Sequence, residues 1–129
     1  MRRLLLDTHA FLWWLRDSPK LSVVARDAIL REENELVVSA VTAWEAALKF
    51  RLGRLPEAEI ITTSFYLLLK QEGMRQLSLT PRHGIRAASY TASHADPFDR
   101  MLAAQAELEG MVLVTRDKAF AGFPIRTLW

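Results

Sequence analysis

The sequence contains no cysteine, which excludes several kinds of chemistry at once. Disulfide frameworks, thiolate metal sites and cysteine nucleophiles all need thiols. Histidine is also scarce, with 3 residues in a chain of 129, so a metal site in this protein would draw mainly on carboxylate oxygens. Those are the ligands that hard divalent cations such as Mg²⁺ prefer.

No apolar run approaches the roughly 18 residues that a transmembrane helix needs. The N-terminus begins like a signal peptide, with two arginines before Leu4–Leu6, but Asp7 and His9 interrupt the apolar stretch and no small-residue cleavage site follows. We therefore expect a cytoplasmic protein. The length favours one domain over residues 1–129, and a hydrophobic content of 50% is enough for a packed core.

The chain has no strong excess of charge of either sign, because 17 Lys and Arg oppose 15 Asp and Glu for a net charge of +2. A balance this mild does not by itself indicate binding to nucleic acid. The distribution of charge matters more, since acids gathered in one cleft leave the remaining surface more basic than the net charge implies. Such an arrangement suits a polyanionic substrate that approaches a bound metal ion.

Short apolar runs alternate with segments of helical periodicity along the chain. The expected strands cover residues 4–6, 36–39, 74–79, 111–115 and 125–128. The expected helices cover residues 9–15, 23–31, 43–52, 57–72, 81–90 and 97–109. Strands that alternate with helices predict an α/β sandwich, with a mostly parallel central sheet flanked by helices.

The helix expected from Pro97 to Glu109 carries two acids at its start. Asp96 suits the N-cap position, Pro97 the first helical position, and Gly110 the C-terminal stop. Asp96 and Asp99 then share one face close to the positive end of the helix dipole, which favours two ionised carboxylates. A purely structural interpretation stays open, in which both acids only stabilise the start of the helix.

Three further acids follow predicted strands. Asp7, Glu45 and Asp117 each lie at or shortly past the carboxyl end of an apolar run. Open parallel sheets bind their ligands at this edge, so we expect these acids to meet Asp96 and Asp99 in one cleft. A divalent ion held there would lower the pKa of its bound water and provide hydroxide that attacks a phosphodiester near neutral pH. The pattern is compatible with one ion or with two.

Glu45 also fits a second interpretation. Thr42 and Glu45 have the spacing of a capping box, in which the threonine caps a helix and the glutamate side chain folds back onto the cap. The two interpretations exclude each other, because a side chain folded back in this way cannot point into a metal cleft.

Four short segments carry these acids in a fixed order. They are Leu-Leu-Asp7-Thr-His-Ala, Val-Ser39-Ala-Val-Thr-Ala-Trp-Glu45, His-Ala-Asp96-Pro-Phe-Asp99-Arg-Met-Leu-Ala-Ala-Gln-Ala and Leu-Val-Thr115-Arg-Asp117-Lys-Ala-Phe. Each segment alone is weakly specific, but together they resemble PIN-domain proteins of the VapC toxin type. The resemblance spans nearly the whole chain.

This resemblance implies a PIN-like α/β/α sandwich and a Mg²⁺- or Mn²⁺-dependent endoribonuclease, acting as the toxin of a type II toxin–antitoxin pair. It implies catalytic roles for Asp7, Glu45, Asp99 and Asp117, of which all but Glu45 would hold the metal. Asp99 matches the family acid that opens the Ala-Ala-x-Ala helix. Asp96 is an extra acid, which we assign as a cap or supporting group.

Hydroxyl and guanidinium groups accompany the acids. Thr8, Ser39 and Thr115 stand beside them in the sequence. Each hydroxyl either supports the metal cluster through hydrogen bonds or serves as a turn and cap residue. Arg100 and Arg116 are candidates for contacts with an RNA phosphate, or for ion pairs with the acids when no metal is bound.

Apolar residues after the first two motifs indicate partners, because surplus apolar surface commonly marks an interface. These residues are Phe11, Trp13, Trp14, Leu15, Phe50, Leu52 and Leu55. We expect a homodimer, and the resemblance implies in addition a cognate antitoxin protein laid along a groove near the active site. An antitoxin arginine against the carboxylates would compete with the metal.

Two other functions are consistent with the residues. A phosphohydrolase of another α/β family would use Asp7 as a covalent nucleophile, but the usual second Asp two residues later is replaced here by His9. A non-catalytic α/β interaction module would use the acids only as helix caps. Retention of the fold and of partner binding after Asp7→Asn, with no metal-dependent activity in the unmodified protein, would favour that module.

Overall fold

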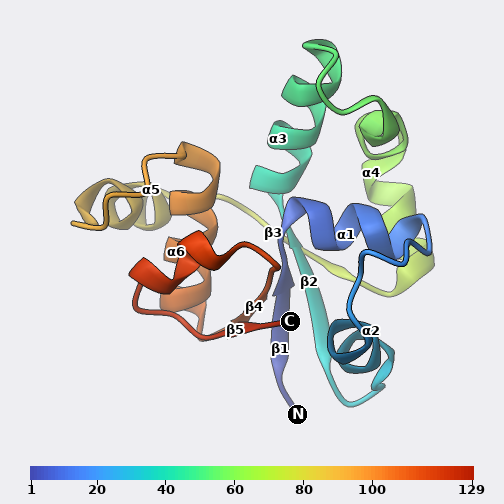
Figure 1. Cartoon of the computed structure of the whole chain (residues 1–129), viewed down its shortest axis with the longest axis horizontal. Helices are drawn as coiled ribbons and strands as arrows, with labels where there is room; N and C mark the ends of the chain where they lie inside the picture. Colours follow the sequence, from blue (N-terminus) through green and yellow to red (C-terminus); the bar gives the residue numbers. More distant parts are fainter.

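A five-stranded parallel sheet forms the centre of the molecule (Figure 1). The computed structural model describes residues 1–129. The strand order is β3-β2-β1-β4-β5, and every neighbouring pair is parallel. The strands are β1 (Arg3–Leu6), β2 (Glu35–Ser39), β3 (Arg75–Leu77), β4 (Val112–Val114) and β5 (Thr127–Leu128). The expected parallel α/β architecture is therefore confirmed.

The carboxyl ends of the three central strands lie level with one another. Leu6 of β1 is the register partner of Val38 in β2 and of Val114 in β4. The strand order reverses at β1, because the chain proceeds to β2 and β3 on one side and later to β4 and β5 on the other. Asp7 follows β1 at this point of reversal, which is where open α/β sheets bind ligands.

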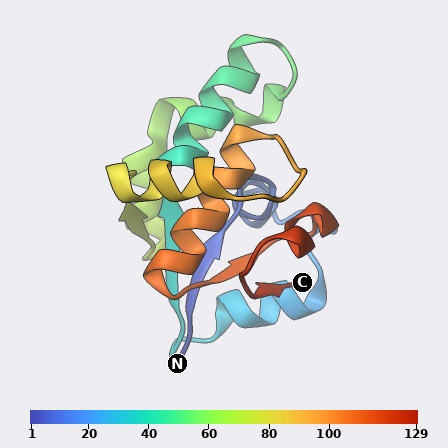
Figure 2. The same ribbon diagram turned by 90° about the vertical axis from the view of Figure 1, so that its left-hand side faces the viewer.

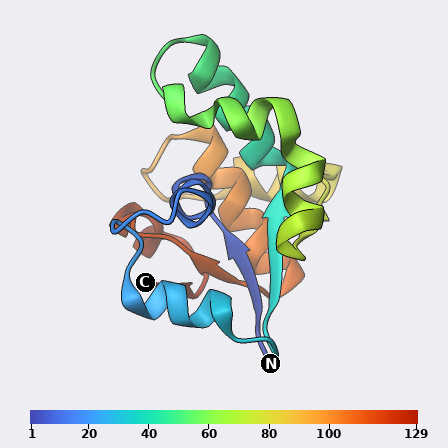
Figure 3. The same ribbon diagram turned by 90° about the vertical axis from the view of Figure 1, so that its right-hand side faces the viewer.

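Six α-helices cover the sheet. They are α1 (Thr8–Leu15), α2 (Val23–Leu30), α3 (Ala40–Arg51), α4 (Glu59–Glu72), α5 (Pro81–Ser89) and α6 (Pro97–Glu109), with 3₁₀ turns at Pro56–Ala58 and Lys118–Gly122. Figure 2 shows α5 and α6 over one face of the sheet, and Figure 3 shows α1, α2 and α4 over the other. None of these helices has both the length and the apolar character needed to cross a membrane.

The sheet separates two hydrophobic cores, because successive side chains of a strand point to opposite faces. Leu4 and Leu6 belong to the core beneath α1, α2 and α4, whereas Leu5 belongs to the core beneath α5 and α6. All three side chains are fully buried. Burial on both faces explains why β1 is a continuous apolar run rather than an alternating one.

The start of α3 differs from the expectation. Ser39, not Thr42, is the N-cap, and its hydroxyl accepts a hydrogen bond from the Val41 amide at 2.9 Å. The helix follows β2 without an intervening loop, so Thr42 falls inside the helix and the predicted Thr42–Glu45 capping box is wrong. The Glu45 side chain is consequently free to take part in a site.

The edge strands are shorter than their apolar patterns predict. β3 spans Arg75–Leu77 rather than residues 74–79, and β5 spans Thr127–Leu128 rather than residues 125–128. Each edge strand has a single neighbour.

Most of the apolar residues that we expected to find on the surface at an interface are instead packed in the core. Phe11 and Leu55 are buried, and four others pack against the core partly buried: Trp13, Trp14, Leu15 and Phe50. The reason is that α1 contacts both β1 and α3 and so buries more than one of its sides. Leu52 is exposed, and further exposed apolar side chains occur along α4, at Ile60, Tyr66 and Leu67.

Candidate active site

Asp7 lies in the middle of the carboxyl edge of the sheet. Its carboxylate accepts a hydrogen bond from the Ala10 amide at 2.8 Å and so caps α1. Only 9% of the residue is exposed. Burial raises the pKa of the Asp7 carboxyl to about 6, and the negative charges of Glu45 and Asp117 add to this effect. A nearby cation would stabilise its ionised form.

Glu45 is buried on α3 and is held from two sides. The Thr8 hydroxyl donates a hydrogen bond to its Oε1 atom at 2.5 Å, and Lys49, one turn further along the helix, forms an ion pair with its Oε2 atom. The Thr42 hydroxyl lies 3.3 Å from that of Thr8 and completes this cluster. Glu45 is therefore an oriented carboxylate rather than part of a helix cap.

The start of α6 supplies two carboxylates with different contacts. Asp96 caps the helix, as expected, by accepting a hydrogen bond from the Asp99 amide at 3.1 Å. The Asp99 carboxylate instead contacts His94, with 2.7 Å between Oδ2 and Nε2. Burial raises the pKa of Asp99 to about 6; the hydrogen bond with His94 opposes this shift, and the charges of Asp96 and Glu45 reinforce it.

Asp117 follows β4 and faces solvent. Its carboxylate accepts a hydrogen bond from the Ala119 amide at 2.9 Å, and its own amide donates to the Thr115 hydroxyl at 3.0 Å. One ligand atom each of Asp117, Asp99 and His94 lies within 4.8 Å of the others. These three residues form the tightest group of potential metal ligands.

The acids line a polar cleft of about 230 Å³ that has no hydrophobic lining residue. All four acids expected to be catalytic contribute to it, and the other lining residues are Thr8, His9, Lys49, His94 and Asp96. The structure therefore brings together acids from four separate parts of the chain at the carboxyl edge of the sheet.

Three residues that line the cleft, His9, Lys49 and His94, were not among the predicted site residues. Lys49 follows Glu45 by four residues, the spacing of a helical ion pair, so the sequence contained a signal for it. His94 reaches Asp99 from a loop, where residue spacing carries no such information.

Ser39 lies outside the cleft. Besides capping α3, its hydroxyl donates a hydrogen bond to Oε1 of Gln105 at 2.5 Å, and both residues are fully buried. This bond joins α3, which carries Glu45, to α6, which carries Asp99. Ser39 thus fixes the relative position of two helices that supply acids.

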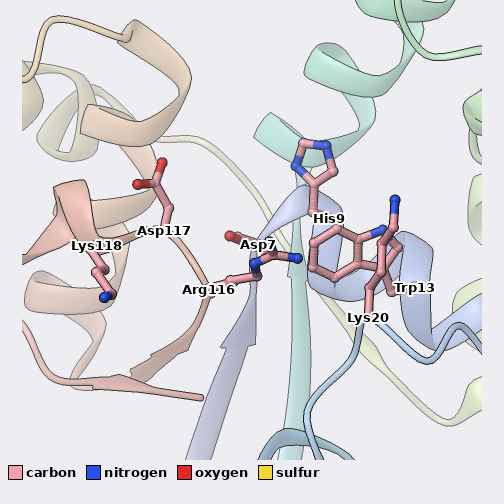
Figure 4. Close-up of a pocket in the computed structure, with 7 residues that line it drawn as sticks. All are labelled: Asp7, His9, Trp13, Lys20, Arg116, Asp117 and Lys118. Atoms are coloured by element: carbon pink, nitrogen blue, oxygen red, sulfur yellow. The ribbon is translucent and has the colours of Figure 1, made fainter.

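Arg100, one of the two candidates for a phosphate contact, is largely engaged by the backbone. Four of its N–H groups donate to backbone carbonyls at 2.6–3.1 Å, those of Ala87, Tyr90, Ala92 and His94. A guanidinium has five N–H donors, so one remains. Arg100 fixes the loop that leads into α6. Arg116, by contrast, is exposed and lines a neighbouring pocket (Figure 4).

The donor set suits a hard divalent cation. The cleft offers carboxylate oxygens together with one close imidazole nitrogen, a combination that Mg²⁺ or Mn²⁺ accepts. The raised pKa of Asp7 and of Asp99 reflects buried negative charge that the protein alone does not neutralise. A bound cation would neutralise it, so the residues fit such an ion.

A family model described as the PIN domain matches residues 4–125. The chain belongs to the PIN-domain family, and the PIN-like fold expected from the four motifs is confirmed.

Individual proteins are similar to this chain over nearly its whole length. Ribonuclease VapC22 of Mycobacterium tuberculosis (strain ATCC 25618 / H37Rv) is 35% identical over 123 residues, which cover 92% of this chain and 89% of that protein. The crystal structure of FitAcB from Neisseria gonorrhoeae has a TM-score of 0.66 at 25% identity, covering 96% of this chain and 95% of that one. A toxin–antitoxin complex from Klebsiella pneumoniae shares the fold, with a TM-score of 0.63 at 18% identity and coverage of 94% and 92%.

Proposed function

We propose that this chain is a metal-dependent endoribonuclease that hydrolyses RNA phosphodiester bonds as the toxin of a type II toxin–antitoxin pair. The observation that carries the proposal is the meeting of four carboxylates in one polar cleft. Membership of the PIN-domain family and the similarity to a ribonuclease support the same activity. In this proposal a single domain over residues 1–129 acts in the cytoplasm.

Asp7, Asp99 and Asp117 are the residues that would hold the ion, for which we propose Mg²⁺ or Mn²⁺. Ions of this kind keep several waters and are usually held by one or two direct carboxylates, so the three acids can divide into ligands and groups that orient bound water. When bound, the ion provides hydroxide near neutral pH and stabilises charge on the phosphate oxygens.

Glu45 has a separate role in this proposal. Thr8 and Lys49 hold both of its carboxylate oxygens, so the side chain keeps one orientation toward the cleft. An oriented carboxylate beside the phosphate accepts a hydrogen bond from the attacking water and directs it. Lys49 also places a positive charge beside the acids before any cation binds.

The remaining polar groups orient the proposed ligands. His94 holds the Asp99 carboxylate, and Asp96 fixes the first turn of the helix that carries it. The Thr115 hydroxyl fixes the backbone of Asp117. Asp96 and Thr115 therefore support the site without needing to touch the substrate.

Purified protein free of any partner is expected to cleave RNA in Mg²⁺ or Mn²⁺ and to lose all detectable cleavage in excess EDTA. Without a cation, the substrate phosphate would meet a cluster of negative charges. Either ion added back in excess over the chelator should restore cleavage. The assay follows a labelled RNA on a denaturing gel, and cleavage that persists after thorough chelation would contradict the proposed metal dependence.

We further propose that the protein forms a homodimer and binds a cognate antitoxin. The exposed Ile60, Tyr66 and Leu67 of α4 give one helix an apolar surface of the kind found at protein interfaces. An antitoxin segment near the cleft, with an arginine against the carboxylates, would block the site by competing with the cation.

Co-expression with the adjacent small reading frame is expected to suppress toxicity, and its product should co-purify with this chain. Light scattering of the isolated chain at micromolar concentrations should give the mass of a dimer. A neighbour that neither binds nor protects would remove the toxin role and leave the nuclease intact. A strictly monomeric protein would contradict the dimer.

A further inference from the structure

A larger and chemically different pocket adjoins the acidic cleft (Figure 4). Its volume is about 700 Å³, and it shares Asp7, His9 and Asp117 with the cleft. The other lining residues are Trp13, Lys20, Arg116 and Lys118. One continuous depression therefore has an acidic part and a basic part, which meet at two of the proposed catalytic carboxylates.

Three exposed cations of this pocket are available to a ligand. The ion pairs and side-chain hydrogen bonds of the protein involve none of the Lys20, Arg116 and Lys118 side chains. Two other cations near the cleft are already engaged. Lys49 forms an ion pair with Glu45, and Arg100 donates hydrogen bonds to four backbone carbonyls. The unengaged positive charge near the cleft is thus concentrated on one side of it.

Trp13 organises two of these cations. The Nζ atom of Lys20 lies 6.0 Å from the centroid of the Trp13 ring, and the Cζ atom of Arg116 lies 5.6 Å from it. Such distances are those of cation–π contacts. Trp13 itself is partly buried and packs edge-on against Trp129, with 5.8 Å between the ring centroids. A ring anchored in the protein therefore holds both cations at the pocket.

We propose that this basic pocket, lined by Trp13, Lys20, Arg116 and Lys118, binds the phosphate of the nucleotide next to the scissile one. The inference rests on the proposed nuclease function and assigns the side of the cleft across which the RNA strand runs. A strand whose scissile phosphate lies at Asp7 and Asp117 must place a neighbouring nucleotide beside those acids, and the pocket is the adjacent space. Small-molecule pockets have volumes of roughly 300–1,000 Å³, so one nucleotide fits.

The roles within the pocket follow from the contacts. Lys20 and Arg116 bind the phosphate directly, because ammonium and guanidinium groups form charge-assisted hydrogen bonds with phosphate oxygens. Figure 4 shows the Lys118 ammonium group on the opposite side of the pocket from Lys20, where it adds to the positive charge around the nucleotide. Trp13 is a positioning residue that acts through Lys20 and Arg116. The pocket lies beside the reacting phosphate, so its residues should affect substrate binding rather than the chemical step.

Binding of a fluorescent single-stranded oligoribonucleotide in EDTA, where cleavage does not interfere, tests the cations. The double variant Lys20→Gln/Arg116→Gln is expected to bind on the order of tenfold more weakly at low salt. The slope of log K against log salt should shrink by about 0.7 for each phosphate that the variant no longer neutralises. The matched control is Lys70→Gln/Arg82→Gln, which removes two exposed cations that do not line the pocket and should bind like the unmodified protein.

Trp13 is tested by two substitutions of different character. Trp13→Phe keeps an aromatic face for the cations, whereas Trp13→Leu removes it. With Mg²⁺ or Mn²⁺ present, Trp13→Leu should raise KM for RNA several-fold and leave kcat unchanged, and its salt slope should match that of the cation variant. Trp13→Phe should restore most of the affinity. A general packing defect would instead lower the active fraction, and hence kcat, without altering the salt slope.

The outcomes separate this inference from the nuclease proposal. If the unmodified protein cleaves RNA and the cation variant binds RNA with unchanged affinity and salt slope, the pocket assignment is wrong and the nuclease proposal stands. If the unmodified protein cleaves no RNA with either ion, the nuclease proposal fails. Loss of affinity in the control variant equal to that in the pocket variant would overturn the assignment as well.

Discussion

Asp7→Asn is expected to abolish detectable RNA cleavage and, at the same time, to raise the melting temperature of the metal-free protein. Cleavage is lost because the proposed cation loses a charged oxygen ligand at the centre of the cleft. Stability rises because the buried carboxylate, whose pKa is raised from 3.8 to about 6, is costly to ionise. Asparagine retains the hydrogen bond to Ala10, since it caps helices about as well as aspartate.

The sign of the pH dependence follows from the raised pKa of Asp7. Between about pH 4 and pH 6 the folded protein binds more protons than the unfolded chain, so the free energy of unfolding falls as the pH rises through this window. Above pH 6 the ionised Asp7 carboxylate lowers the free energy of unfolding by a value on the order of 3 kcal/mol. Asp7→Asn should restore this stability.

Thermal denaturation in EDTA checks this stability prediction. Asp7→Asn should melt well above the unmodified protein at pH 7.5, and the difference should disappear near pH 4. A variant that is less stable at pH 7.5 would show that the Asp7 carboxylate stabilises the fold. Asp27→Asn, an exposed position on α2 away from the cleft, is the matched control and should change neither activity nor melting temperature appreciably.

Asp99→Asn and Asp96→Asn are expected to differ sharply, although the two positions are one helical turn apart. The Asp99 carboxylate lies within 4.8 Å of the ligand atoms of His94 and Asp117, so its loss should abolish cleavage. One oxygen of Asp96 accepts the Asp99 amide, a task that asparagine performs as well. Asp96→Asn should therefore retain activity within about tenfold of the unmodified protein.

Cleavage rates at saturating Mn²⁺, measured with both variants at equal folded fraction, decide between the two acids. An inactive Asp96→Asn beside an active Asp99→Asn would reverse the assignment of the third carboxylate. Loss of activity in both would give Asp96 a direct role in holding the cation or the substrate.

The sheet and the helix boundaries were predictable where local chemistry decides them. The Leu4–Leu6 run is apolar because both faces of β1 are buried, and the Asp96, Pro97 and Gly110 pattern sets the ends of α6 through cap geometry. The start of α3 was not predictable in this way. Thr42 and Ser39 are both good caps, and the choice depends on how directly the chain turns from β2 into the helix.

Asp7, Glu45 and Asp117 were predictable because each comes after a strand that ends at the same edge of the sheet, and Asp96 and Asp99 were predictable from the cap pattern of α6. The contacts that the loop before α6 makes around these acids were not predictable from the sequence. Arg100 is engaged by four carbonyls that only the folded loop brings together, and His94 meets Asp99 through the path of that same loop. The basic pocket depends on Trp13 meeting Arg116 across the sheet edge, a contact between residues that sequence spacing does not relate.

The Ser39 hydroxyl couples the two helices that carry Glu45 and Asp99. One oxygen atom accepts the Val41 amide at the start of α3 and donates to Gln105 in the middle of α6. Because a fully buried group left without its partner is costly, neither helix can loosen without weakening the other. Glu45 and Asp99, carried by those two helices, are therefore expected to order and disorder together when the protein opens locally.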